Sequence, residues 1–182
     1  QEPFLFSDSI TNNISFGLNE KTKEEDRLIK VKQTSEAVSF SNEIESFPNK
    51  YEQLVGERGV TLSGGQKQRA ALARAIINDP QILLLDDVFS SVDTQTEKQI
   101  LENIKKLSGN KTCFIVAHRI STIKNSDFII VLDAGEIKEK GTHQELLKFN
   151  GLYANLYRKQ LLSEELGLEE YNTIKKDEPN EN

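Results

Sequence analysis

The stretch LLLDDVFSSVD, residues 83–93, decides how the rest of the chain is interpreted. A run of aliphatic residues ends in two adjacent carboxylates, Asp86 and Asp87, and a short turn leads to a third, Asp93. Neighbouring carboxylates repel each other and lose solvation when buried. Taken alone, the pair is best explained as two acids solvated at the end of a strand. The sharper hypothesis is a metal-nucleotide site, in which one carboxylate holds Mg²⁺ and the second orients or deprotonates a water.

Apolar patterns on either side of this stretch alternate between strand and helix. Fully buried strands are predicted for Ile82–Leu85, TCFIVA (112–117) and DFIIVL (127–132), with a short fourth strand, EIKEK (136–140), after the Ala134-Gly135 turn. Helices are predicted for 64–77, for 94–107 and for a last pair that ends near residue 161. Capping boxes are predicted for the pairs Ser63/Gln66, Thr94/Glu97 and Thr142/Glu145. This alternation indicates an α/β fold with a parallel sheet.

Composition limits the class of protein. The 182 residues suffice for one ordinary domain, and 36% hydrophobic with 29% charged residues is a globular composition. The net charge of −6 argues against nucleic acid as the main partner. The single cysteine, Cys113, fits a reducing compartment, and no apolar run reaches the ~18 residues of a membrane span. The sequence holds no methionine, so we expect it to be a piece of a longer polypeptide.

The segment LSGGQKQR, residues 62–69, predicts an anion site. If a helix starts at Ser63, its free backbone N–H groups and positive dipole end face outward through Gly64 and Gly65. Two residues without side chains let a phosphate approach the backbone. A helix cap with a flexible entry is the simpler explanation for a bare Ser-Gly-Gly, but the longer LSGGQ before a basic, Ala-rich helix is more specific.

His118 ends the strand TCFIVAH. A histidine at a strand end is more often structural than catalytic. Because ligands bind outside the carboxyl ends of parallel strands, His118 is expected at the same sheet edge as the two aspartates, which favours contact with a γ-phosphate.

Together these motifs resemble the nucleotide-binding domain of ABC (ATP-binding cassette) transporters, over about residues 1–160. The matching segments are LSGGQ (the signature), ILLLDD (Walker B), SSVD (the D-loop), His118 (the H-loop) and Gln1 (the Q-loop glutamine). VGERG (55–59) and the run from Ala117 to Leu147 are similar to exporter-type members. The resemblance implies an incomplete P-loop NTPase (RecA-like) parallel sheet with an α-helical subdomain. It divides the chain into 1–75 (Q-loop and helical subdomain), 76–161 (core portion) and an acidic tail, 162–182, expected to be disordered.

The resemblance also implies site residues. Asp86 and Gln1 would serve Mg²⁺; Asp87 and His118 would be catalytic; Ser63, Gly64, Gly65, Gln66 and Asp93 would bind ATP. The implied partners are a second nucleotide-binding domain, head-to-tail, and the coupling helices of a membrane domain, at the cytoplasmic face of the cell membrane.

Two departures from the family pattern matter. The sequence contains no phosphate-binding loop G-x-x-x-x-G-K-[ST], so we expect the chain by itself to hold ATP poorly. Asp87 stands where the family usually has a catalytic glutamate, and its carboxylate falls about 1.5 Å short of a glutamate's. A general base typically contributes about 10²- to 10⁴-fold. Asp87 therefore resembles the degenerate site of heterodimeric exporters. Two alternatives stay open: a non-catalytic scaffold half, and a soluble ABC ATPase.

Overall fold

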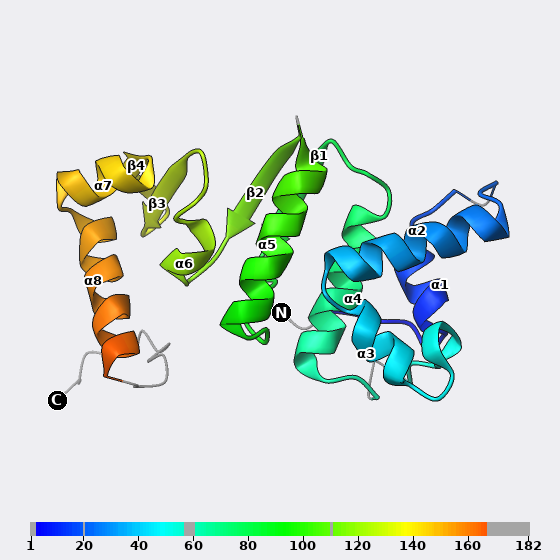
Figure 1. Cartoon of the computed structure of the whole chain (residues 1–182). Helices are drawn as coiled ribbons and strands as arrows, with labels where there is room; N and C mark the ends of the chain where they lie inside the picture. The colour runs from blue at the N-terminus through cyan, green and yellow to red at the C-terminus, as the bar shows by residue number, and fades with distance from the viewer. Residues whose placement is uncertain (1–2, 20, 57–60, 110, 167–182) are drawn as a thin grey trace, which may run out of the picture. The chain divides into compact units, whose positions relative to one another are not determined.

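The computed structural model describes residues 3–19, 21–56, 61–109 and 111–166, and it divides into two compact units (Figure 1). The first unit comprises residues 1–118 and the second residues 119–182. The boundary expected between residues 75 and 76 falls inside the first unit. There, helix α4 (Gly64–Ile76) and strand β1 (Ile82–Asp86) contribute to one hydrophobic core.

The first unit is mainly helical. Figure 1 shows α1 to α4 gathered together, with α5 beside the two strands. Besides α4 and β1, its elements are α1 (Ile10–Ser15), α2 (Glu24–Ala37), α3 (Ser41–Ser46), the 3-10 helix η1 (Lys50–Glu52), α5 (Thr94–Ser108) and β2 (Thr112–Val116). Leu72 of α4, Leu85 of β1 and Ile100 of α5 belong to the same buried cluster. The segment that carries LSGGQ and the segment that carries the two aspartates are therefore packed on one core.

Strands β1 and β2 pair in parallel, as predicted, with Leu83 opposite Cys113 and Asp86 opposite Val116. The expectation that β1 is fully buried was wrong. Leu83 and Leu85 are buried, whereas Ile82 and Leu84 are 62% and 72% exposed. Successive side chains of a strand point to opposite faces, and only one face of this sheet packs on the core.

The second unit is built around a hairpin. Strands β3 (Ile129–Asp133) and β4 (Glu136–Gly141) pair antiparallel, and they are joined by Ala134 and Gly135 at φ 49° and 78°. Positive φ at both turn residues matches the twist of a two-residue hairpin. Strand β3 was expected to be buried, but Ile130 and Leu132 are exposed.

In its described residues, 119–166, the second unit also has three helices, α6 (Ile120–Ile123), α7 (His143–Phe149) and α8 (Leu152–Glu165). They pack with Ile129 of β3 around Leu146 and Tyr153. Helix α8 continues to Glu165, into the tail that we expected to be disordered; residues 167–182 lie outside the described residues. Among the helices of the described ranges, none combines the length and the apolar character that a bilayer span requires.

Two of the three predicted capping boxes are present. The backbone N–H of Ser63 donates to Gln66 Oε1 (2.9 Å), and the N–H of Thr142 donates to Glu145 Oε2 (2.8 Å). The Thr94/Glu97 box was wrong. Asp93 caps α5 by accepting from the N–H of Thr96 (2.9 Å), and Glu97 is only 2% exposed. Asp93 precedes Thr94 by one residue and is itself a strong N-cap, so the helix is capped there and Glu97 is buried instead of completing a box.

Candidate functional site

The predicted anion site is the first turn of α4. Ser63 caps the helix, with its hydroxyl accepting from the N–H of Gln66 (3.3 Å), and Ser63 and Gly64 are exposed. Because the first backbone N–H groups of a helix have no partner within it, this turn presents donors to an anion. The geometry at residues 63–65 thus fits the predicted role of a phosphate contact.

Gln66 is held on both sides of its amide group. Its Oε1 accepts from Ser63, and its Nε2 donates to Glu43 of α3 (2.7 Å). Glu43 also forms an ion pair with Arg69 of α4 (2.5 Å). The side chain of Gln66 therefore fixes the start of α4 against α3. Its predicted ATP contact remains a prediction.

The two glycines of the signature face the turn at residues 90–91. A Cβ atom on Gly65 would lie 2.7 Å from the carbonyl oxygen of Ser91, and one on Gly64 would lie 3.3 Å from the Ser91 side chain. The first distance is too short for any side chain without a backbone shift. Close packing inside the chain is therefore a second reason for glycine here, beside the approach of a phosphate that the sequence suggested.

Asp86, Asp87 and His118 lie at one edge of the β1–β2 sheet. Asp86 is opposite Val116 in the parallel register, and the N–H of Asp87 donates to the Val116 carbonyl (3.0 Å). His118 follows two residues after Val116, and all three predicted side chains are exposed. The structure thus brings together the two carboxylates and the histidine, as expected for the carboxyl ends of neighbouring parallel strands.

The backbone of Asp87 is left-handed, with φ 48°. Non-glycine residues seldom adopt this region, and aspartate and asparagine tolerate it better than most. Aspartate at this position therefore suits the local conformation, a factor that a comparison of side-chain lengths alone cannot show.

Asp93, predicted to contact ATP, serves as the N-cap of α5. The hydrogen bond from Thr96 lowers the pKa of its carboxyl group below the ordinary value. Its oxygen is thus directed toward a helix start, and a nucleotide contact is untested for this residue. Gln1 lies outside the described residues, as do the last three residues of VGERG.

The residues at the sheet edge suit a Mg²⁺ ion that is also bound by water and phosphate better than a metal ion bound only by protein side chains. Within the described part of the chain, no three His, Cys, Asp or Glu side chains gather as a metal cluster. Mg²⁺ usually takes one or two carboxylates and completes its shell with waters and substrate phosphates. The carboxylate of Asp86, exposed at a strand end, fits that need, with Asp87 beside it.

Sequence reasoning missed Arg74 and Asn13. Arg74 of α4 donates to the carbonyl of Asn13 (2.8 Å), to its side-chain oxygen (2.9 Å) and to the carbonyl of Phe4 (2.9 Å). Its guanidinium lies over the rings of Phe6 and Phe16, and burial lowers its pKa. The sequence predicts a basic, Ala-rich helix after LSGGQ, but nothing in it shows that Arg74 meets residues 4–16.

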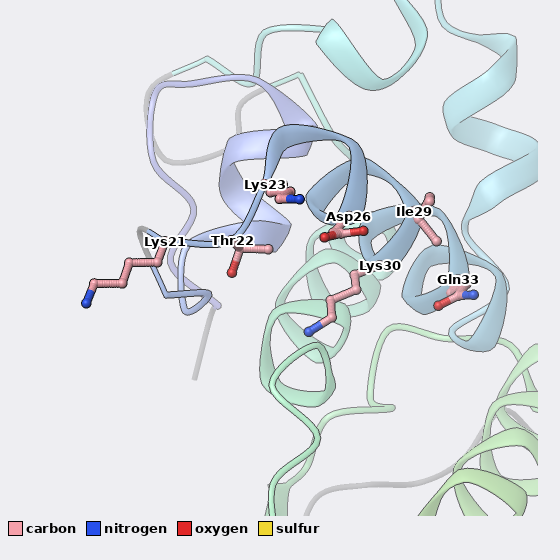
Figure 2. Close-up of a pocket in the computed structure, with 7 residues that line it drawn as sticks. All are labelled: Lys21, Thr22, Lys23, Asp26, Ile29, Lys30 and Gln33. Carbon is pink, nitrogen blue, oxygen red and sulfur yellow. The ribbon is translucent and has the colours of Figure 1, made fainter.

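A shallow pocket of about 520 Å³ lies at the start of α2, away from all these residues (Figure 2). Lys21, Lys23, Asp26 and Lys30 are among its lining side chains, and Figure 2 shows Lys21 extending away from the hollow. It contains none of the predicted site residues.

Comparison with known proteins agrees with the motifs. The family model described as "ABC transporter" matches residues 1–90. The chain is 49% identical over 156 residues to ATP-binding cassette sub-family B member 5 of Mus musculus, covering 86% of this chain and 12% of that protein. It is 46% identical over 160 residues to the ATP-dependent lipid A-core flippase of Alkalilimnicola ehrlichii, covering 88% and 26%.

A solved structure shows the same fold. The chain superimposes on a bacterial Atm1-family ABC exporter with ATP bound, with a TM-score of 0.82 and 39% identity, over 88% of this chain and 27% of that one. The chain thus spans about an eighth to a quarter of the length of these relatives. The motifs in their order, the shared fold and the high identity lead to one conclusion: the chain belongs to the nucleotide-binding domains of the ABC transporter family, and ABC exporters are among its relatives.

Proposed function

We propose that this chain is part of the ATP-binding and ATP-hydrolysing motor of an ABC exporter, which drives the export of a solute across a membrane. The observation that carries the proposal is the packing of two motifs on one unit. The capped turn Ser63–Gly65, suited to a phosphate, touches the turn that follows the Asp86-Asp87 pair. Two of the relatives, a lipid A-core flippase and an Atm1-family ABC exporter, favour transport over a soluble ATPase.

In this proposal the partner is a second nucleotide-binding domain in a head-to-tail arrangement. The α4 turn of one chain would meet the γ-phosphate bound by the other, because helix start and dipole favour a negative charge there. Ser63, Gly64 and Gly65 then serve the partner's ATP. The pairing is heterodimeric. This chain has an intact signature and a shortened base, so a partner with a full-length base would form one fully active site with it.

At the chain's own nucleotide, each residue at the sheet edge has a role. Asp86, with Gln1, holds Mg²⁺, and the metal neutralises phosphate charge when bound. Asp87 orients or deprotonates the attacking water, with less reach than a glutamate. His118 contacts the γ-phosphate from the neighbouring strand, and Asp93 lies in the loop that meets the partner.

The N-terminal aromatic residues fit contact with a membrane domain. Phe4, Phe16 and Leu54 are 59%, 64% and 63% exposed, and the rings of Phe6 and Phe16 stack at 4.5 Å. Arg74 holds this segment on α4. An apolar surface fixed to the signature helix is suited to receive the coupling helices at the cytoplasmic face of the membrane.

The test uses the full-length protein with its partner in lipid vesicles. We expect hydrolysis of Mg-ATP that requires the partner. We expect Gly65→Asp to abolish it at the partner's site, because the side chain places a negative charge against the γ-phosphate and also collides with the Ser91 carbonyl, as any side chain here would. Gln99→Asp is the control, because it adds the same charge at an exposed position of α5, outside the predicted site residues.

Equal turnover by the wild type and Gly65→Asp would contradict the trans role of the signature. Absence of any turnover in the assembled wild-type complex would favour the alternative of a non-catalytic scaffold. Full turnover without a membrane partner would favour the soluble ATPase.

A further inference from the structure

Gln68, on the second turn of α4, connects that helix to the turn at residues 90–91. Its Nε2 donates to the Ser90 hydroxyl (2.7 Å), and its Oε1 accepts from the backbone N–H of Ser91 (2.9 Å). The side chain is 8% exposed. Both ends of a buried amide are therefore used by two consecutive residues, 22 and 23 positions away in the sequence.

Ser90 passes this connection on to Asp87. The Ser90 hydroxyl donates to the carbonyl oxygen of Asp87 (3.2 Å), and the N–H of Asp87 donates to Val116 of β2 (3.0 Å). The left-handed backbone of Asp87 is thus bonded on both sides. A hydroxyl that accepts one hydrogen bond and donates another polarises both, so the two bonds reinforce each other.

The two signature glycines make this connection possible. The Ser91 carbonyl occupies the space where a Cβ of Gly65 would be, at 2.7 Å. The start of α4 and the turn after Asp87 are therefore in direct backbone contact. Because the two segments are closely packed, neither can move far without moving the other.

We infer that Gln68 is a positioning residue: it holds the carboxylate-bearing backbone of Asp87 in a fixed relation to the phosphate-facing turn of α4. The inference rests on the proposed function, in which Asp87 serves the chain's own nucleotide and the α4 turn serves the partner's. Gln68 then links the two half-sites that this chain contributes. Binding of nucleotide at one site therefore changes the position of the residues at the other.

The test is carried out on the full-length complex with its partner, with Mg-ATP as the probe. Gln68→Met keeps an unbranched side chain of similar length and removes both amide contacts. We expect kcat to fall about tenfold, the size of coupling often found between residues in contact, while KM for ATP stays within about twofold. KM is expected to be spared because the Gln68 side chain is buried and both ends of its amide are bonded to Ser90 and Ser91.

Ser90→Ala tests the same link from the other end, at an exposed residue where the substitution is compatible with folding. We expect a loss of kcat of about threefold or more, restored by Ser90→Thr, which keeps the hydroxyl. The double variant Gln68→Met/Ser90→Ala is expected to be no slower than Gln68→Met, because both changes break one connection. Gln99→Ala on the exposed side of α5 is the matched control and should retain the wild-type kcat.

Two results would overturn the inference: an unchanged kcat in folded Ser90→Ala, or losses in the two single variants that multiply in the double variant. Thermal unfolding of each complex shows whether it is folded at the assay temperature. If Gln68→Met does not fold, Ser90→Ala and Ser90→Thr decide the matter. Failure of the proposed function has a different signature, since the unmodified complex would then not hydrolyse Mg-ATP at all.

Discussion

Asp87 combines a short carboxylate with an unusual backbone. Its φ of 48° is in a region that aspartate tolerates, and its carbonyl and N–H are bonded to Ser90 and Val116. The length of the side chain and the conformation of the main chain are therefore separate properties of this position. A substitution changes the length of the side chain, while the two hydrogen bonds maintain the main-chain conformation.

Asp87→Glu tests the proposal that this residue is a shortened base. In the assembled transporter, with the partner's own base disabled, we expect hydrolysis at this chain's nucleotide to rise by about tenfold at most, below the full range of a general base. One methylene restores reach to the water, while the left-handed backbone is somewhat less favourable for glutamate. Single-turnover hydrolysis measures the change. An unchanged rate, with the partner's signature intact, would show that Asp87 already reaches the water.

Gly65→Ala separates the two reasons for glycine in the signature. The methyl group carries no charge, yet it would collide with the Ser91 carbonyl at 2.7 Å. We therefore expect Gly65→Ala to lose most turnover as well, in addition to a destabilisation of about 1–3 kcal/mol from overpacking. ATP turnover and thermal unfolding of the complex measure both effects. Normal turnover in Gly65→Ala, alongside an inactive Gly65→Asp, would assign the glycine to the phosphate alone.

At the scale of elements, helix starts are fixed by side chains from other elements as well as by local caps. Gly151 precedes α8 and supplies no side-chain cap. Glu139 of β4 takes that role, accepting from the N–H groups of Leu152 and Tyr153. The Glu145 carboxyl caps α7 within its own box, and the hydrogen bonds from Thr142 lower its pKa. The hairpin and the two final helices are thereby joined into one unit.

The burial of Tyr153 predicts that this unit loses stability at high pH. Burial raises the pKa of Tyr153 to about 12, with a further contribution from Tyr157, and its hydroxyl is 2.8 Å from His143 Nδ1. The folded state favours the neutral phenol, so the contribution of Tyr153 to the free energy of unfolding is complete below pH 10. It is lost as pH rises from 10 through 12, amounting to about 2 to 3 kcal/mol.

The measurement is urea unfolding of the chain at pH 9 and pH 11, compared with Tyr153→Phe. The wild type should lose stability over this interval and the variant should lose less. Tyrosinate absorbance provides an independent check, since one of the four tyrosines should titrate last and be missing from the variant. Equal pH dependence of both proteins would refute the assignment.

At the scale of the whole chain, the exposed face of the β1–β2 sheet is the main liability. Ile82, Leu84, Phe114 and Val116 are between 56% and 72% exposed and lie on one face of two paired strands. Large apolar patches on open sheets favour association.

We expect the purified chain to self-associate, and we expect Leu84→Lys with Phe114→Glu to reduce this. The two residues are opposite each other in the register, so the new charges attract across the strands. Sedimentation velocity measures the outcome, and Gln95→Lys with Gln99→Glu, on the exposed side of α5, adds the same charges elsewhere. Equal association of both double variants would show that the sheet face is not responsible.

Features that depend on near neighbours could be predicted from the sequence. The α4 start at Ser63, the box at Thr142 and the turn Ala134-Gly135 follow from residues within four positions of one another. The motif order also placed Asp86, Asp87 and His118 at one sheet edge, because parallel strands share the direction of their carboxyl ends. Where an element was predicted wrongly, as for the cap of α5, two good local candidates competed within one residue.

Only the tertiary structure decided the rest. Gln68 reaches Ser90 across 22 positions, and Arg74 reaches Asn13 across 61. The need for glycine at position 65 comes from a carbonyl oxygen 26 positions further along the chain. The burial of Leu83 beside an exposed Leu84 depends on which sheet face the core covers. By itself, the sequence determined where the strands and helices such as α4 and α7 begin and which chemistry is expected of them, because those signals are local. The contacts that fix that chemistry in space arise only when distant segments pack, and side-chain type alone does not specify which of them meet.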